Sequence, residues 1–401
     1  MMSSTITSIA AWIFWISVFE IIYSYVLYPV LLRLLSGWFG RPPCRWGLDR
    51  SGVAAVSSDT EGLPTVAIVM PVYNEENIIA IKLQNIFSLN YPARKLSVWI
   101  GSDCSTDRTE EIVRSLRDPR IHVWAAPYRC GKTQILNALV PQVEAEVLVF
   151  TDADVMLDSE SVRSLARHFA DPKIGGVGGR ATLRQTMGFE NSEEVAYLSF
   201  EAAQKKMESS LHSTISAFGS FYAIRKKLFV PFHPHTYSND DVLMPMNIIR
   251  QGYRMLFEFD AVSYEKMSRQ VGKEFKRRIR IGAGNFQAFF WLLDFLNPGY
   301  GWPWFCYVSH KVSRWFSPMF MIIAAATCGL LAAGTTALLY KILFIAGTLF
   351  ITSGLLYKII PMNFSRSVFY FLAMNVALVL GFFRFLIGIR SAVWSRTERP
   401  A

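Results

Sequence analysis

Long apolar stretches at both ends of the chain constrain its fold more than any other feature. Residues 9–35 are almost entirely apolar, with Glu20 as the one acid, and further apolar stretches follow at 316–340, 342–360 and 368–389. About 20 such residues span the hydrocarbon core of a bilayer. The first stretch lacks the basic start and small-residue cleavage site of a signal peptide, the competing interpretation. We therefore expect membrane-spanning helices, with Glu20 facing protein or a polar cavity.

The composition agrees with a membrane protein that also has a folded polar domain. Of the 401 residues, 52% are apolar and 18% are charged, which excludes a disordered chain, and the net charge is +10. The five cysteines are scattered, without a CxxC pair. Neither a zinc site nor a disulfide framework is indicated, and a reducing compartment fits.

Basic residues predict which side of the membrane holds the central region. They follow the first apolar stretch and precede the second, so the positive-inside rule places residues between them in the cytoplasm of a multi-pass inner (plasma) membrane protein. The tail is also basic, which conflicts with three C-terminal crossings. One of the three C-terminal segments is therefore expected to be re-entrant or interfacial, without any indication of which. The basic residues are Arg33, Arg41, Arg45, Arg50, Lys311, Arg314, Arg390, Arg396 and Arg399.

The central region alternates short apolar runs with helical patterns. Continuous apolar runs of this length, such as TVAIVM, are typical of strands buried on both faces. Strict alternation predicts an α/β domain with a parallel, doubly wound sheet, in which ligands bind beyond the carboxyl ends of the strands. The expected strands are 65–70, 96–100, 121–124 and 147–151, and the helices between them are 77–88, 106–116 and 133–140.

Acidic residues gather where three of these strands end. Glu75 follows the first strand, Asp103 and Asp107 follow the second, and Asp152 and Asp154 follow the fourth. Carboxylates crowded at one sheet edge disfavour one another's ionisation. A hard divalent cation with oxygen ligands, bridging to a substrate diphosphate, removes that cost.

Several other motifs have a simpler interpretation. Gly131-Lys132-Thr133 lacks the earlier glycine of a P-loop and opens a helix after the third strand, which argues against a nucleotide triphosphatase. The glycines of 175–179 favour close backbone packing over dinucleotide binding, and His233 and His235 favour a turn over a metal site.

Two further segments each allow two interpretations. Asp240 and Asp241 precede an apolar helix at 242–250, either as acids that complement the helix dipole or with Asp241 as a general base. The strongly basic segment 273–287 suits anionic lipid headgroups, a clamp on phosphate, or both.

Taken together, six motifs resemble those of a known family. They are PVYNEEN, SDCSTDRT, RCGKTQILN, TDAD, SNDDVLMPMNIIRQGYR and FKRRIRIGAGNFQ, and they occur in the order found in membrane-bound, inverting family-two glycosyltransferases of the GT-A fold. The members of this family that the chain resembles make bacterial polysaccharides or lipid-linked glycans. The resemblance covers residues 63–287, agrees with the flanking apolar stretches and implies a Rossmann-like, mostly parallel sheet.

The resemblance implies a site for a nucleotide-sugar donor. Asp103 is similar to the acid that holds the nucleobase, and Lys132 is similar to the lysine near the donor diphosphate. The nucleoside pocket is expected to be lined by Pro71, Tyr73 and Glu75.

The same resemblance implies catalytic and metal-binding residues. Asp152 and Asp154 match the DxD pair that binds the donor through Mg²⁺ or Mn²⁺, and Asp241 matches the catalytic base. The arginines expected at the donor, in the family's Gln/Arg-x-x-Arg-Trp region, are Arg277, Arg278 and Arg280.

That last motif departs from the pattern of processive synthases. Arg277 stands where they carry Gln, and Ile281 stands where they carry a Trp that stacks at the acceptor end. We therefore expect transfer of a single hexosyl or N-acetylhexosaminyl group, from UDP-sugar, to a lipid-linked or glycan acceptor. A processive synthase, a transporter and a catalytically silent partner of a secretion complex are the alternatives. A lipid bilayer is an expected partner and nucleic acid is not.

The expected organisation has six parts. They are an N-terminal transmembrane helix at 1–38, a linker at 39–62, a cytoplasmic GT-A domain at 63–270, basic and aromatic interfacial helices at 271–315, C-terminal transmembrane segments at 316–392 and a tail at 393–401.

Overall fold

The computed structural model describes residues 3–41, 62–183, 192–265, 271–359 and 362–389. Most of the expected linker, at 42–61, and the expected tail lie outside the described residues. The chain divides into two compact units, which are described separately. The helical unit comprises Met1–Arg33, Gln270–Gly299 and Trp304–Gly388, and the sheet unit comprises Leu34–Arg269, Tyr300–Pro303 and Ile389–Ala401.

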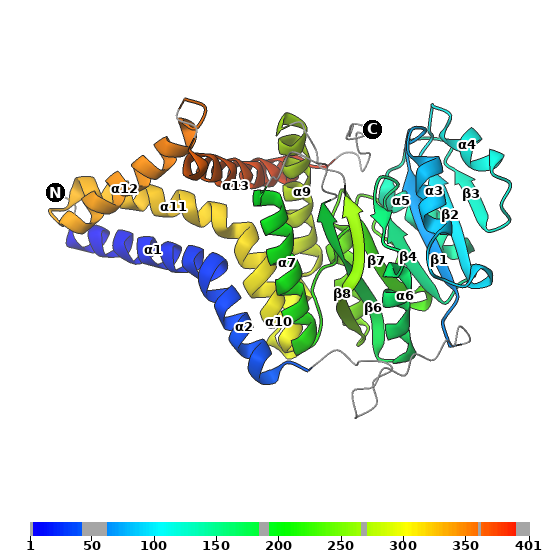
Figure 1. Cartoon of the computed structure of the whole chain (residues 1–401). Helices are drawn as coiled ribbons and strands as arrows, with labels where there is room; N and C mark the ends of the chain where they lie inside the picture. The colour runs from blue at the N-terminus through cyan, green and yellow to red at the C-terminus, as the bar shows by residue number, and fades with distance from the viewer. Residues whose placement is uncertain (1–2, 42–61, 184–191, 266–270, 360–361, 390–401) are drawn as a thin grey trace. The chain divides into compact units, whose positions relative to one another are not determined.

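The sheet unit is built on one eight-stranded sheet of mixed direction (Figure 1). The strand order is β3-β2-β1-β4-β7-β6-β8-β5. Neighbours are parallel from β3 to β4 and between β6 and β8, whereas β7 is antiparallel to β4 and β6 and β5 is antiparallel to β8. The strands are β1 Val66–Val72, β2 Leu96–Ser102, β3 Ile121–Ala125, β4 Val147–Thr151, β5 Met156–Leu157, β6 Ile174–Leu183, β7 Phe221–Arg225 and β8 Arg254–Glu265.

The four predicted strands are confirmed as β1 to β4, and so is the mostly parallel sheet that the resemblance implies. β7 runs against its neighbours, so the sheet is only mostly parallel. β1 also extends two residues beyond its predicted end and includes Pro71. The proline is tolerated because pairing with β4 ends at Val69, so its missing N–H breaks no ladder on that side.

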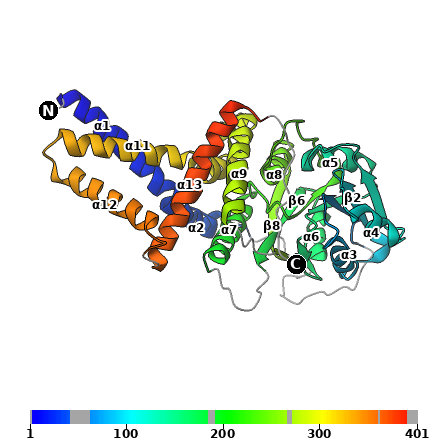
Figure 2. The same cartoon turned by 90° about the horizontal axis from the view of Figure 1, so that it is seen from above.

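Helices cover both faces of the sheet. Seen from above, α3 and α6 lie on one side of the sheet, and α5 and α8 lie on the other (Figure 2). The first face packs buried side chains of β1 against α3 and α6, and the second brings α5 against β2 at Gly101. The α-helices of this unit are α3 Ile79–Phe87, α4 Thr109–Ser115, α5 Lys132–Leu139, α6 Ser161–Ala166, α7 Ser192–Leu211 and α8 Asp240–Arg250. Short 3-10 helices occupy Ala93–Lys95, Val140–Gln142, Arg167–Ala170 and Lys226–Leu228.

The glycine-rich segment forms a central strand, as the expectation of close packing requires. A Cβ on Gly176 would lie 2.5 Å from the Met255 sulfur, and one on Gly179 would lie 2.3 Å from the Phe221 ring. Both glycines belong to β6, next to β7 and β8. These residues therefore pack the sheet rather than bind a nucleotide.

The helical unit contains helices that are long and apolar enough to cross a membrane. The described residues include four such candidate spans: Ser4–Phe39, whose C-terminal end belongs to the sheet unit, Trp302–Gly334, Leu338–Leu355 and Asn363–Ile387. The first consists of α1 Ser4–Ile22, a π-helical turn Tyr23–Leu27 and α2 Tyr28–Phe39, and the second of α10 Trp302–Cys306, a π-helical turn Tyr307–Val312 and α11 Ser313–Gly334. The others are α12 Leu338–Leu355 and α13 Asn363–Ile387, and α9 Val271–Trp291 with 3-10 helices Leu293–Leu296 and Pro298–Tyr300 precedes α10.

Polar residues within these spans pair with one another. Ser313 donates a hydrogen bond to the Glu20 carboxylate, and the Tyr23 and Ser309 hydroxyls lie 2.7 Å apart. The expectation that Glu20 faces protein is confirmed. The second span begins at Trp302 rather than 316, because the helix continues through the polar residues that interrupt the apolar run.

Candidate active site

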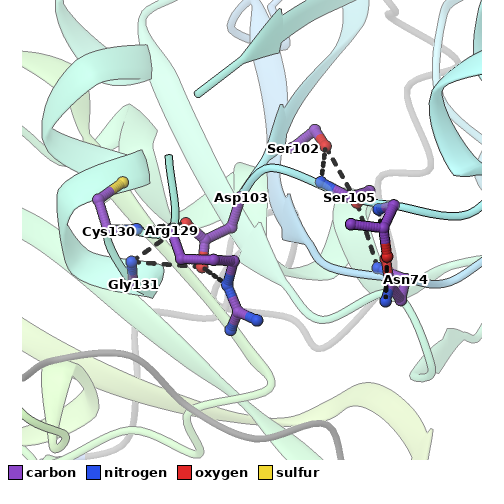
Figure 3. A network of polar contacts seen from close by, with 8 residues as sticks. Asn74, Ser102, Asp103, Ser105, Arg129, Cys130 and Gly131 are labelled. Atoms are coloured by element: carbon purple, nitrogen blue, oxygen red, sulfur yellow. Dashed lines mark hydrogen bonds and ion pairs between the residues drawn. The ribbon is translucent and has the colours of Figure 1, made fainter. Parts of the chain in front are cut away.

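Asp103 organises the turn that opens helix α5. It follows β2 and is completely buried. Its carboxylate accepts hydrogen bonds from the backbone N–H groups of Cys130, at 2.7 Å, and Gly131, at 3.2 Å, and pairs with the Arg129 Nε at 2.9 Å (Figure 3). These charge-assisted contacts hold the residues that lead directly into α5. Burial, together with the neighbouring Asp103, raises the pKa of the Cys130 thiol to about 11, so the thiol stays protonated at neutral pH.

The loops after β1 and β2 are tied to each other. The Asn74 N–H donates to the Ser105 hydroxyl at 3.2 Å (Figure 3). The Asn74 side-chain oxygen accepts from the Thr106 N–H at 2.8 Å. The Glu75 N–H donates to the Thr109 hydroxyl at 2.8 Å. These bonds bring the two predicted acidic clusters to one edge of the sheet.

The residues expected to line a nucleoside pocket differ in their surroundings. The Arg129 guanidinium lies 3.3 Å from the centre of the Tyr73 ring, a cation–π contact, so Tyr73 adjoins the Asp103 network. Tyr73 and Glu75 are half-buried, whereas Pro71 is buried within β1. Arg129 was not among the predicted site residues. Its place at the start of the RCGKTQILN motif, three residues before Lys132, was the available signal.

Lys132 links the ends of three elements. It is the first residue of α5, and its Nζ lies 3.1 Å from an Asp152 carboxylate oxygen and 3.2 Å from one of Asp240. It also donates to the Gly219 carbonyl at 3.3 Å. Burial disfavours the charged ammonium, but the two aspartates outweigh it and raise the pKa of Lys132 above its usual value. This ammonium therefore remains positive and gathers the residues around it.

Asp240 and Asp241 begin helix α8 and have different surroundings. The Asp240 side chain is 10% exposed and pairs with Lys132. Asp241 is half-buried, and a Cβ built on Gly219 would lie 3.5 Å from one of its carboxylate oxygens. The absence of a side chain at Gly219 thus leaves room beside the Asp241 carboxylate. Sequence reasoning missed the contact of Asp240 with Lys132 and the role of Gly219. The adjacent acids Asp240 and Asp241 gave a sequence signal for the contact with Lys132, but not for the role of Gly219.

A buried tyrosine also indicates that these aspartates are gathered in one place. Tyr222 of β7 is completely buried, and its hydroxyl has no hydrogen-bond partner among the described residues. Burial first, and then the negative charges of Asp240, Asp241 and Asp152, raise its pKa well above the usual value. Each of these charges must be close enough to oppose ionisation of one phenol.

The Asp152–Asp154 turn presents its two acids away from the core. Ala153 and Val155 are buried, while Asp154 is half-buried and the Asp152 side chain is 42% exposed. Two accessible carboxylates at a strand end supply the oxygen ligands that Mg²⁺ and Mn²⁺ prefer. No group of three or more His, Cys, Asp or Glu side chains within the described ranges is arranged to hold a metal. The Asp152 and Asp154 carboxylates by themselves fit a cation that takes its remaining oxygen ligands from a bound diphosphate.

The remaining predicted residues belong to other elements. Arg277, Arg278 and Arg280 are half-buried on α9 of the helical unit, and their contact with the donor stays a prediction. His233 and His235 form the expected turn, in which the Thr236 N–H donates to the His233 carbonyl at 2.9 Å.

Comparison with known proteins finds similarities that include part of the sheet unit. The family model for glycosyl transferase family 2 matches residues 67–230. The glycosyltransferase AglE of Haloferax volcanii is 26% identical over 240 residues, which are 59% of this chain and 77% of AglE. A poly-beta-1,6-N-acetyl-D-glucosamine synthase of Staphylococcus aureus is 22% identical over 244 residues, which are 60% of this chain but only 58% of the synthase.

A solved structure shares the fold. The mannosyltransferase PcManGT from Pyrobaculum calidifontis, determined in complex with GDP-Man and Mn²⁺, superposes with a TM-score of 0.70. The superposition covers 95% of this chain and 98% of PcManGT, at 21% identity. The family model spans β1 to β7 and the acidic strand ends between them, so this part of the chain matches glycosyl transferase family 2, and the chain has the GT-A fold.

Proposed function

We propose that the protein is an inverting, metal-dependent transferase at the cytoplasmic face of the inner membrane. It transfers one sugar from a nucleotide-diphosphate sugar, with UDP as the proposed nucleotide, to a lipid-linked or glycan acceptor in the synthesis of a cell-surface polysaccharide. One observation carries the proposal: Lys132 pairs with Asp152 and Asp240, at 3.1 and 3.2 Å, and bonds to Gly219, which lies beside Asp241. The Lys132 ammonium, a positive charge for the diphosphate, thus lies near Asp241, the proposed base for the acceptor.

The donor is held at both ends by residues of the sheet unit. Asp103, Tyr73 and Arg129 adjoin one another where the nucleoside would bind. Asp152 and Asp154 would hold Mg²⁺ or Mn²⁺, which when bound neutralises charge on the diphosphate. The Lys132 ammonium supplies a further positive charge where negative charge develops on the leaving group.

Asp241 is the proposed base of a single displacement. Its carboxylate accepts the proton of the acceptor hydroxyl as that oxygen forms a bond to the anomeric carbon. The bond from the anomeric carbon to the diphosphate oxygen breaks, and the nucleoside diphosphate leaves with the electron pair. One displacement inverts the anomeric configuration, so an α-linked donor gives a β-linkage.

The candidate spans support an acceptor that resides at the membrane. Four described helices are long and apolar enough to cross a bilayer, and the arginines of α9 precede the second of them. A lipid-linked acceptor would be concentrated at such a protein. The complex of PcManGT with GDP-Man and Mn²⁺ supports a nucleotide sugar and a divalent metal as ligands of this fold.

A processive synthase is the second candidate, favoured by the similarity to the poly-beta-1,6-N-acetyl-D-glucosamine synthase. Ile281, where processive synthases carry Trp, favours single addition instead. Product length distinguishes the two candidates. Purified protein supplied with donor and a lipid extract should extend each acceptor by one sugar, and long polymers would favour the synthase.

The proposed base is tested with Asp241→Asn. Release of UDP or GDP is first measured with a panel of nucleotide sugars and a lipid extract, which identifies the donor. With that donor, Asp241→Asn should lower transfer at least 100-fold, as expected for loss of a general base, while donor affinity changes less than about threefold. Equal loss of transfer and donor binding would remove Asp241 from the base role.

The proposed metal site is tested with Asp154→Ala and with EDTA. Both should abolish the metal-dependent part of donor binding, measured by calorimetry on the full-length protein. Glu160→Ala, which removes an exposed acid of the sheet unit outside the proposed site, is the control and should bind like wild type. Unchanged donor affinity in EDTA would contradict the metal assignment.

A further inference from the structure

A lysine is completely buried beneath the Asp152–Asp154 turn. Lys82 lies on α3 with no exposed surface, and its neighbours on that helix, Ile79, Leu83 and Ile86, belong to the apolar core. An ammonium ion in such a place is costly unless it is fully hydrogen-bonded or paired with charge. Burial lowers the pKa of Lys82 to about 7, and Asp152 and Asp154 act against that shift. Well-packed apolar residues often replace buried charged groups without loss of stability, so the presence of Lys82 calls for another explanation.

The partners of Lys82 lie on either side of the two acids. Its Nζ donates to the Thr151 hydroxyl at 3.1 Å and to the Val155 carbonyl. Thr151 is the last residue of β4, immediately before Asp152, and Val155 comes immediately after Asp154. One ammonium therefore joins both ends of a three-residue turn and sits on the core side of it.

A second side chain of α3 continues this attachment. Asn85 lies three residues after Lys82, on the same side of the helix. Its amide nitrogen donates to the Leu157 carbonyl at 2.8 Å, and its amide oxygen accepts from the Leu157 N–H at 2.8 Å. Lys82 and Asn85 together make four hydrogen bonds to residues 151–157, which we name the α3 clamp. The clamp fixes the path of the chain on which the two carboxylates stand.

We propose that the α3 clamp is a positioning device for metal binding, in which Lys82 holds the Asp152–Asp154 turn so that both carboxylates are ready to share a divalent cation with the donor diphosphate. This inference rests on the proposed function. Lys82 has no exposed surface, so it acts through the turn and touches no substrate. It differs in this respect from Lys132, which contacts Asp152 directly at the accessible side.

The test compares Lys82→Met with wild type in the full-length protein. Mn²⁺ binding is measured by the loss of the free Mn²⁺ resonance signal, and binding of the donor identified above is measured by calorimetry with Mn²⁺ and with EDTA. Residues that orient metal ligands are typically worth 10–100-fold in metal affinity. Lys82→Met should therefore weaken Mn²⁺-dependent donor binding at least 10-fold, with the affinity that persists in EDTA unchanged.

Two other variants make the comparison decisive. Asn85→Ala should weaken Mn²⁺-dependent donor binding in the same direction by a smaller factor, and it decides the matter if Lys82→Met does not fold. Lys226→Met is the matched control, because Lys226 also donates to a backbone carbonyl, that of Val143, but away from the turn. It should leave the Mn²⁺ dependence unchanged.

The outcomes separate this inference from the proposed function. Wild-type protein that binds no nucleotide sugar with Mn²⁺ would overturn the proposed function itself. Wild-type binding with an unaltered Mn²⁺ dependence in Lys82→Met and Asn85→Ala would overturn the α3 clamp alone. A lower unfolding temperature without a change in Mn²⁺ dependence would show that Lys82 has only a structural role. This result would also overturn the α3 clamp.

Discussion

Cys104 has a left-handed backbone, with φ of 57°, in the loop after β2. A side chain in this conformation costs about 1–2 kcal/mol, which glycine avoids. Cys104→Gly should therefore raise the stability of the protein by about 0.5–1 kcal/mol, after the greater freedom of the unfolded chain is subtracted. Thermal unfolding measures the change. Cys104→Ala, which removes the sulfur but keeps the Cβ, should give no such gain, and equal stabilisation by both variants would contradict the strain argument.

The pKa of Glu258 predicts how the stability of the protein depends on pH. Burial opposes its charge, but hydrogen bonds from His168 and Arg167 outweigh burial and lower its pKa from 4.5 to about 2. The folded state therefore favours the carboxylate, and this contribution is complete above pH 4.5 and lost as the pH falls from 4.5 towards 2. A shift of this size corresponds to about 3 kcal/mol.

The variant Glu258→Gln isolates that contribution. Thermal unfolding of wild type and variant is compared at pH 7 and at pH 3.5. Wild type should be more stable at pH 7, and its advantage should shrink by roughly half at pH 3.5. An advantage that is constant between these pH values would show that the Glu258 carboxylate is not the titrating group.

At the scale of elements, α9 and α13 approach each other closely through small residues. A Cβ on Gly381 of α13 would lie 2.7 Å from the backbone nitrogen of Ala283 and the carbonyl carbon of Gly282 on α9. Backbone atoms cannot rotate away, so the helices would have to separate. Gly381→Ala should therefore destabilise the protein by about 1–3 kcal/mol.

A second glycine in the same unit provides the control for this packing. A Cβ on Gly347 of α12 would meet nothing within 4 Å. Gly347→Ala should leave thermal stability unchanged or raise it by at most about 1 kcal/mol, through helix propensity. Destabilisation by both variants would show that the loss of glycine flexibility, rather than helix contact, is responsible.

For the whole molecule, the four candidate spans predict integral association with membranes. Ser4–Phe39, Trp302–Gly334 and Asn363–Ile387 exceed the about 20 residues that cross a hydrocarbon core, and Leu338–Leu355, with 18 residues, lies within the observed range of about 17–25. Extraction of cell membranes at alkaline pH and high salt should leave the protein in the pellet, and detergent should release it. Release by salt or alkali alone would indicate a peripheral protein held by its charge of +10.

The sequence by itself determined the apolar spans and the strand-end position of the acids. Both depend on local pattern: hydropathy over about 20 residues marks a span, and parallel strands necessarily bring their carboxyl ends to one edge. Asp103, Asp152 and Asp154 were identified in this way. The antiparallel β7 was not, because a short apolar run carries no signal for strand direction or partner.

Only the tertiary structure decided which side chains meet at that edge. Lys132 contacts Asp240, Lys82 reaches Thr151 and Val155, and Arg129 covers Tyr73, although these partners are tens of residues apart in the chain. Such contacts depend on how α3, α5 and α8 pack on the two faces of the sheet. No local spacing encodes that packing, because it is the sum of many contacts between distant elements.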